Sequence, residues 1–313
     1  MKDDMDNKLV TLIGGGGFLG RYIAQSLLAA GARVRIAQRD PRQAFFLKPQ
    51  GGLGQTQFIA VDVTRPETVA NAVHGADAVV NLVGTFAGNI AGIHVDGARH
   101  VAQAAAANGA ALVHVSAIGA DANGASTYAR TKGLGEEAVR AACPSATILR
   151  PSTVFGREDQ FINRFAGMIA RLPVVPVLRG GARFQPVFVG DVARATVAAL
   201  ADAETFGGRT FELGGPEVLT MLELHQRIAR HIGRTPHLVA LPDAVGGALA
   251  ALPGTPITND QWKMLGRDSV VGAGAEGFAA LGISPTPLDA VAPEWLVRYR
   301  KAGRFSLIQR AAG

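Results

Sequence analysis

Cysteine and long apolar runs are scarce in this sequence, and each scarcity excludes a class of protein. The only cysteine among the 313 residues is Cys143, which excludes an intramolecular disulfide and a cysteine-based metal site. No apolar run reaches the ~18 residues that a membrane-spanning helix needs. The first residues are polar and acidic and do not resemble a signal peptide. We therefore expect a protein with no transmembrane segment, located in the cytoplasm.

Clusters of basic residues are also lacking, although the formal net charge is +6. The arginines and lysines are scattered, and no basic run is interleaved with aromatic residues, so we expect no nucleic-acid partner. A basic surface that meets an anionic cofactor, an acidic partner or a membrane surface is the simpler interpretation. The seven histidines form no set with metal-ligand spacing, and we predict no metal site.

What the sequence does contain is a regular alternation of short apolar runs and amphipathic stretches. Strands separated by helices of ten or more residues predict an α/β fold, a doubly wound parallel sheet of the Rossmann type with right-handed crossovers. The expected strands cover residues 9–13, 33–38, 57–61, 78–82, 112–116 and 146–149. The expected helices between them cover residues 18–30, 98–108 and 128–142.

The second half is less regular and predicts a smaller C-terminal lobe on the substrate side of the sheet. We expect residues 8–155 to form the dinucleotide-binding core, with residues 184–214 returning to it. Within that return, residues 185–189 and 210–213 read as strands around a helix. Residues 156–183 and 215–308 would form the smaller substrate-side or docking lobe.

A glycine-rich loop follows the first strand and opens the first helix. Its glycines Gly14, Gly17 and Gly20 have the spacing G-x-x-G-x-x-G, with Phe18 and Leu19 at the start of the helix. Such a loop turns sharply, brings backbone N–H groups close to a pyrophosphate and aims a helix N-terminus at its charge. An ordinary glycine-rich turn is the alternative, but the strand–turn–helix context favours dinucleotide binding.

The end of the second strand selects between the two nicotinamide cofactors. An acidic residue there accepts hydrogen bonds from the ribose hydroxyls of NAD(H) and repels a 2′-phosphate. This chain has Gln38, Arg39 and Asp40 instead, and Arg39 is able to pair with a 2′-phosphate. We therefore predict NADP(H), with NAD(H) bound through Asp40 as the alternative.

Further motifs resemble an extended or atypical short-chain dehydrogenase/reductase, of the NAD-dependent epimerase/dehydratase kind, over roughly residues 8–215. In addition to the glycine loop, they are Asp62-Val63, Asn81-Leu82-Val83-Gly84, Ser116, Tyr128-x-x-x-Lys132 and Arg150-Pro151-x-x-Val154-x-Gly156. The resemblance implies that Asp62 and Val63 flank the adenine. It also implies that Leu82, Val83 and Gly84 pass beside the cofactor, and that Pro151 and Val154 border the nicotinamide.

The same resemblance implies a catalytic set of Ser116, Tyr128 and Lys132. Tyr128 and Lys132 share one helix face at the i, i+4 spacing, and a neighbouring ammonium favours the phenolate. Lys132 would also hold the nicotinamide ribose, and Ser116 would hydrogen-bond the reacting oxygen. The alternative is that Tyr128 and Ser116 are ordinary surface or helix-cap residues. Extended enzymes commonly have an asparagine where this chain has His94, which weakens the analogy with their proton relay.

Further segments, spread over nearly the whole chain, resemble the bacterial form of a narrower family, the nucleotide-binding accessory subunits of respiratory complex I (alpha-subcomplex subunit 9 type). They are the segments 51–55, 156–166, 185–189 and 258–261, together with Tyr299-Arg300 and Gly303-Arg304-Phe305. The resemblance implies a structural NADP(H), complex I subunits as partners and peripheral association with the inner membrane, on its cytoplasmic face, through them.

Two functions therefore remain open. One is an accessory or assembly subunit of complex I that holds NADP(H) without turnover. The other is an active NAD(P)-dependent reductase, dehydrogenase or epimerase that acts on a carbonyl or sugar-nucleotide substrate. The apolar segment 238–257 has two interpretations as well, a lobe packed on the core or a docking surface for a membrane-bound partner.

Overall fold

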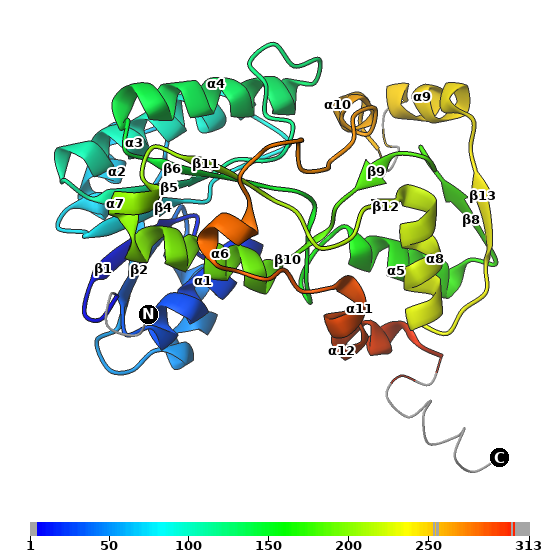
Figure 1. Ribbon diagram of the computed structural model, residues 1–313, viewed down its shortest axis with the longest axis horizontal. Helices are drawn as coiled ribbons and strands as arrows, with labels where there is room; N and C mark the ends of the chain where they lie inside the picture. Colours follow the sequence, from blue (N-terminus) through cyan, green and yellow to red (C-terminus); the bar gives the residue numbers. More distant parts are fainter. Residues whose placement is uncertain (1–4, 253, 255–256, 302, 304–313) are drawn as a thin grey trace. The chain divides into compact units, whose positions relative to one another are not determined.

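The computed structural model describes residues 5–252, 254, 257–301 and 303, and these form two compact units (Figure 1). The first unit takes in residues up to 151 with residues 189–213 and 272–284, and the second takes in residues 152–188, 214–271 and those from 285 onward. The division differs from the expected one in three ways. The chain leaves the first unit already after Pro151, it returns at Val189 and not at residue 184, and residues 272–284 also return to the first unit. Arg304, Phe305 and the end of the expected lobe lie outside the described residues.

The first unit is built on a seven-stranded parallel sheet, which confirms the predicted Rossmann-type fold. Its strand order is β11-β6-β5-β4-β1-β2-β3, so the chain starts in the middle and winds outward in both directions. The strands are β1 (Leu9–Ile13), β2 (Arg33–Gln38), β3 (Thr56–Ala60), β4 (Ala78–Asn81), β5 (Ala111–Val115), β6 (Thr147–Pro151) and β11 (Thr210–Leu213).

Helices cover both faces of this sheet (Figure 1). One face carries α1 (Phe18–Ala29) and α6 (Val189–Ala201), which pack on each other. The other carries α2 (Pro66–Val73), α3 (Gly97–Ala107) and α4 (Thr127–Ala142). Shorter elements of the unit are the 3-10 helices η1 (Pro41–Gln50) and η3 (Phe278–Leu281), the π-helical turn η2 (Gly92–Asp96) and α7 (Ala203–Phe206).

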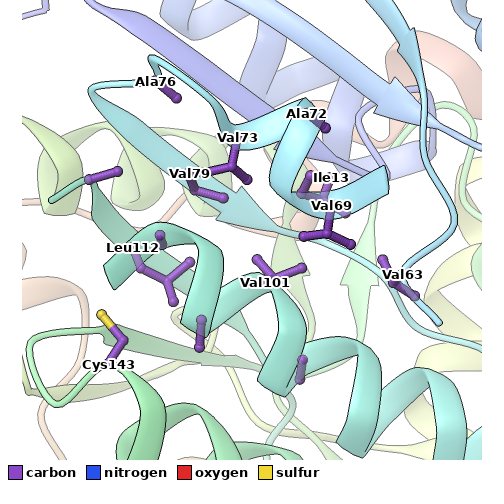
Figure 2. Close-up of a cluster of buried hydrophobic side chains, with 14 of the residues drawn as sticks. Ile13, Val63, Val69, Ala72, Val73, Ala76, Val79, Val101, Leu112 and Cys143 are labelled. Atoms are coloured by element: carbon purple, nitrogen blue, oxygen red, sulfur yellow. The ribbon is translucent and has the colours of Figure 1, made fainter. Parts of the chain in front are cut away.

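The core under α2, α3 and α4 consists almost entirely of alanine and valine. Figure 2 shows Val69 and Val73 of α2 and Val101 of α3 grouped with the strand residues Val79 and Leu112, and all five are buried. Side chains this small allow the helices to approach the sheet closely. Burial of this apolar surface stabilises the sheet whose carboxyl edge bears the candidate site.

The second unit contains three two-stranded pairings and its own apolar core. The pairs are β7 (Val154–Phe155) with β10 (Val187–Phe188), β9 (Arg183–Phe184) with β12 (Leu219–Thr220), and β8 (Val174–Val177) with β13 (His237–Ala240). The helices are α5 (Ile162–Arg171), α8 (Met221–His231), α9 (Asp243–Ala251), α10 (Asn259–Met264), α11 (Leu288–Val291), α12 (Pro293–Leu296) and the 3-10 turn η4 (Val297–Tyr299).

The expected strand over residues 185–189 shortens to Val187–Phe188. Pro186 has no backbone N–H to donate to a ladder, and the Gln185 N–H instead donates to the Ser269 carbonyl at 2.9 Å. Within the part of the chain that the structure describes, no helix has the length and apolarity to cross a membrane.

Candidate functional site

The loop between β1 and α1 has the backbone of a phosphate cradle. Gly14 has a φ of +85°, in the left-handed region that glycine tolerates best. A Cβ on Gly20 would lie 2.4 Å from the Gly15 carbonyl oxygen, so only glycine fits there. Helix α1 starts at Phe18 without a side-chain cap and with no acidic residue in its first turn. The helix N-terminus therefore fits an anionic group such as a pyrophosphate.

Gln38, at the end of β2, fixes the shape of this loop and was not predicted as a site residue. Its Oε1 accepts a hydrogen bond from the Gly16 N–H at 3.0 Å. Its Nε2 donates to the Asp40 carbonyl at 2.7 Å. One side chain thus ties the glycine loop to the segment that selects the cofactor.

Arg39 and Asp40 differ in how far their side chains are engaged. The Asp40 carboxylate accepts from the Arg42 N–H at 3.1 Å, which caps η1, and pairs with the Arg42 guanidinium at 3.2 Å. The hydrogen bonds from Arg42 hold the pKa of Asp40 below its ordinary value. Arg39 is exposed, and no hydrogen bond or ion pair holds its side chain within the described residues. Arg39 is therefore available for a ligand, whereas Asp40 is committed to a helix cap.

The predicted adenine residues follow β3. Asp62 Oδ1 accepts hydrogen bonds from the Thr64 N–H at 3.0 Å and from its hydroxyl at 2.8 Å. These hydrogen bonds lower the pKa of Asp62, and the nearby charge of Arg39 adds to the effect. Val63 is buried, and a Cβ on Gly97 of α3 would lie 2.7 Å from its Cγ2. The turn is thus rigidly held, and its role toward adenine remains a prediction.

The segment after β4 lies directly beside the glycine loop. The Leu82 N–H donates to the Ile13 carbonyl at 2.9 Å, and a Cβ on Gly14 would lie 3.2 Å from Val83 Cγ2. The Val83 N–H donates to Asn81 Oδ1 at 3.2 Å, and Gly84 follows as an exposed residue. The structure therefore brings these predicted cofactor residues together with the glycine loop.

Ser116 stands at the carboxyl end of β5 with an unsatisfied hydroxyl. The residue is 4 % exposed, and its Oγ has no hydrogen-bond partner within the described residues. Such a buried polar atom requires an external partner, which fits the predicted contact with a ligand oxygen. Pro151 ends the neighbouring strand β6, where its carbonyl accepts from the Ile118 N–H at 3.0 Å. Val154 belongs to β7 in the second unit, paired with Val187.

Tyr128 lies in the first turn of α4 under a second aromatic ring. The ring of Phe86, from the loop after β4, stacks on it with a centroid distance of 4.5 Å and an interplanar angle of 14°. Burial raises the pKa of Tyr128 to about 12, so its phenol is neutral at pH 7. Sequence patterns did not identify Phe86, because a single exposed phenylalanine in a loop belongs to no periodic pattern.

Lys132 projects from the next turn of α4 and is 4 % exposed. Its Nζ donates a hydrogen bond to the Val115 carbonyl at 2.8 Å, at the end of β5. Burial lowers the pKa of Lys132 to about 8, and the carboxylate of Glu136 partly opposes that effect. The ammonium group is thus anchored to the backbone of the residue that precedes Ser116. Its other N–H groups are able to donate to a ligand.

His94 in η2 fastens the Phe86 loop to α4. The Thr131 hydroxyl donates to the Thr127 carbonyl at 2.8 Å, and its oxygen accepts from His94 Nδ1 at 2.9 Å, because Nε2 of the neutral ring is the acceptor atom. The Thr85 N–H donates to His94 Nε2 at 3.0 Å. Both ring nitrogens are therefore engaged by protein groups.

The protonation state of His94 follows from the same surroundings. Burial lowers its pKa to about 4, with a smaller contribution from Lys132, and the imidazole is neutral at pH 7. A neutral ring whose two nitrogens are occupied does not serve as a proton relay. Extended enzymes commonly have an asparagine at the position of His94. In this chain the histidine instead connects the loop after β4 to α4 through its two ring nitrogens.

The arrangement can therefore hold a dinucleotide but offers little for proton transfer. The glycine loop and the bare N-terminus of α1 suit a pyrophosphate, and the Ser116 Oγ has no hydrogen-bond partner within the described residues. Tyr128 is a neutral phenol that can donate a hydrogen bond. Among the described residues, no cluster of three metal-ligating side chains exists.

Comparisons with known proteins relate the chain to one family. Residues 10–214 match the NAD dependent epimerase/dehydratase family. The chain is 35 % identical to the mitochondrial NADH dehydrogenase [ubiquinone] 1 alpha subcomplex subunit 9 of Arabidopsis thaliana, over 94 % of this chain and 79 % of that protein. It is 32 % identical to the ceramide reductase of Caulobacter vibrioides, over 79 % of this chain and 80 % of the relative.

Solved structures resemble the chain as well. An epimerase from Methanothermobacter thermautotrophicus superimposes with a TM-score of 0.73, with 98 % of this chain and 96 % of that chain covered. The sequences are 19 % identical, so this likeness shows the shared fold.

Proposed function

The chain belongs to the NAD dependent epimerase/dehydratase family, and from that membership we propose that it is an accessory or assembly subunit of respiratory complex I that holds NADP(H) as a structural group. The observation that carries this proposal is the extent of the similarity to the complex I subunit of Arabidopsis thaliana. That similarity covers 94 % of this chain, well beyond the part that the family match alone spans.

The choice of NADP(H) over NAD(H) rests on the side chains after β2. Arg39 is exposed and has no hydrogen bond or ion pair within the described residues, so its guanidinium is free to meet a 2′-phosphate. The Asp40 carboxylate already caps η1 and pairs with Arg42. A ribose hydroxyl would have to share the Asp40 carboxylate with Arg42 and Gln43, which disfavours NAD(H).

A bound nucleotide needs no turnover to be useful. A ligand present at 100 times its dissociation constant stabilises the native state by about 2.7 kcal/mol. In this role Lys132 would hold the nicotinamide ribose, Ser116 would satisfy its buried hydroxyl, and Tyr128 would act as a neutral donor. When bound, the cofactor would supply hydride chemistry, but the neutral His94 and the stacked Phe86 leave Tyr128 poorly equipped to exchange a proton.

An active reductase is the alternative, and one observation favours it. The ceramide reductase of Caulobacter vibrioides is similar over 79 % of this chain, and Ser116, Tyr128 and Lys132 match the pattern of the short-chain enzymes. The variant Tyr128→Phe distinguishes the two hypotheses. A reductase would lose turnover, whereas a structural subunit would retain its nucleotide and its partners, because the stacked ring remains.

The decisive experiment follows the chain in its own membranes. A tagged chromosomal copy would be tracked by native gel after mild solubilisation, beside an in-gel stain for NADH dehydrogenase activity. Co-migration, at a level that Tyr128→Phe leaves unchanged, supports an accessory subunit held by its partners. A chain that never co-migrates, in mature or assembling complexes, overturns the proposal and directs the search to a carbonyl substrate.

A further inference from the structure

The connection between β2 and β3 carries an exposed surface that the proposed function does not use. This η1 surface consists of the exposed residues Phe45, Phe46 and Lys48 of η1 and Leu53 of the following loop, with the half-buried Arg21 of α1 at its border. Phe45 and Phe46 are 41 % and 43 % exposed, and Leu53 is fully exposed. Large apolar side chains in solvent are unfavourable, and their concentration in one short connection indicates a contact surface.

The loop that presents Leu53 is held in place. The Gly52 N–H donates to Gln55 Oε1 at 2.7 Å, and Gln55 Nε2 donates to the carbonyl of Ala32 at 3.3 Å, just past the end of α1. Gly54 completes the turn with a φ of +78°. Leu53 therefore points into solvent from a structured turn.

Cations accompany the apolar side chains. Lys48 Nζ lies 3.7 Å above the centroid of the Phe45 ring, and the Arg21 guanidinium lies 4.6 Å above that of Phe46. Residues 41–61 contain no aspartate or glutamate. The surface thus combines aromatic and aliphatic groups with positive charge, and its two cations stay beside the rings.

We propose that the η1 surface binds the headgroup region of an anionic lipid bilayer directly. Phenylalanine and leucine side chains insert at the boundary between headgroups and acyl chains, while lysine and arginine remain at the level of the phosphates. The pairing of each cation with a ring matches that layering. This inference does not depend on association with complex I, because it concerns the isolated chain and a lipid surface.

Flotation with vesicles tests it on the purified full-length protein. One set of vesicles contains phosphatidylcholine alone and the other a mixture of phosphatidylcholine and phosphatidylglycerol. We expect the wild type to float with the mixed vesicles, less with the neutral ones, and less again at high salt. The double variant Leu53→Ser/Lys48→Glu should bind the mixed vesicles about tenfold more weakly. Neither residue belongs to the cofactor site, so retention of bound nucleotide should not change.

The matched control is Val218→Ser/Lys263→Glu, an equivalent change on exposed residues of the second unit. It should float like the wild type. The proposal is overturned when the wild type does not float with the mixed vesicles, or when both double variants lose binding equally. It is also overturned when Leu53→Ser/Lys48→Glu still floats but no longer co-migrates with NADH dehydrogenase activity, because the surface would then contact an acidic protein.

Discussion

His94 makes the stability of this protein depend on pH in a calculable way. His94 is 2 % exposed, and burial lowers the pKa of its imidazole from 6.5 to about 4. Between these values the unfolded chain binds a proton that the folded chain does not, so the free energy of unfolding decreases as the pH falls from 6.5 toward 4. The linkage relation gives a loss of ~2 kcal/mol between pH 7.5 and pH 5, and ~3.4 kcal/mol once titration is complete.

Replacement by glutamine isolates this contribution. His94→Gln keeps an acceptor for the Thr85 N–H, loses the contact with Thr131 and does not titrate. At pH 7.5 we expect the variant to be less stable than the wild type by about 1 kcal/mol, for one lost hydrogen bond. At pH 5 the order should reverse, because the wild type alone has lost the ~2 kcal/mol that belongs to His94.

Urea unfolding followed by circular dichroism, at a series of pH values between 7.5 and 5, measures both effects. The buried His225 is present in both proteins, so its contribution cancels in the difference. The pKa of His114 is lowered chiefly by burial, and the charge of His94 contributes less, so His114 contributes nearly equally to both proteins. His74→Gln, a change at an exposed histidine, is the control and should keep the pH dependence of the wild type. Equal losses of stability in His94→Gln and the wild type would refute a buried, neutral His94.

Three further changes test the site and its support. Gly20→Ala places a Cβ 2.4 Å from a backbone oxygen and should abolish nucleotide retention through purification, whereas Gly181→Ala, in open space, should not. Arg39→Gln should weaken NADP(H) binding by roughly 10- to 100-fold and leave NAD(H) binding unchanged in a calorimetric titration. Glu136→Gln breaks the buried ion pair with Arg150, at 2.7 Å, and should lower the free energy of unfolding by about 3 kcal/mol.

Contradictory outcomes are equally specific. An alanine at Gly20 that retains nucleotide would place the pyrophosphate elsewhere. Equal losses for both nucleotides in Arg39→Gln would return the cofactor choice to Asp40. Arg150 also lies 3.5 Å from Glu212. A Glu136→Gln variant as stable as the wild type would mean that Glu212 alone is a sufficient ion-pair partner for Arg150.

Much of the first unit could be predicted from sequence because its signals are local. The run Leu9–Ile13, the glycine spacing that follows it and the helix from Phe18 lie within one short stretch, and backbone requirements alone dictate those residue types. The return of Thr210–Leu213 to the sheet was predicted for the same reason, since a short apolar run after a helix suits an outer parallel strand.

The short elements were less accessible. The η1 helix begins with Pro41 and contains Pro49, so its sequence lacks a helical period and was not predicted. The strand expected over residues 185–189 failed at Pro186, where a missing N–H prevents a longer ladder. Its neighbour Gln185 found a backbone partner in Ser269, far along the chain. Local propensity does not reveal such a partner.

The sequence by itself determined the parallel sheet and the glycine cradle, because each depends on a spacing or a backbone requirement. It also indicated the candidate residues, Arg39 through its charge at the end of the second strand, and Ser116 and Lys132 through the resemblance to a known family. Only the tertiary structure decided the protonation state and the accessibility of the site side chains. Packing placed Phe86 on Tyr128 and His94 between two threonines, and it buried Lys132 against a carbonyl. Protonation and access depend on such contacts between distant segments, and no pattern within one segment encodes them.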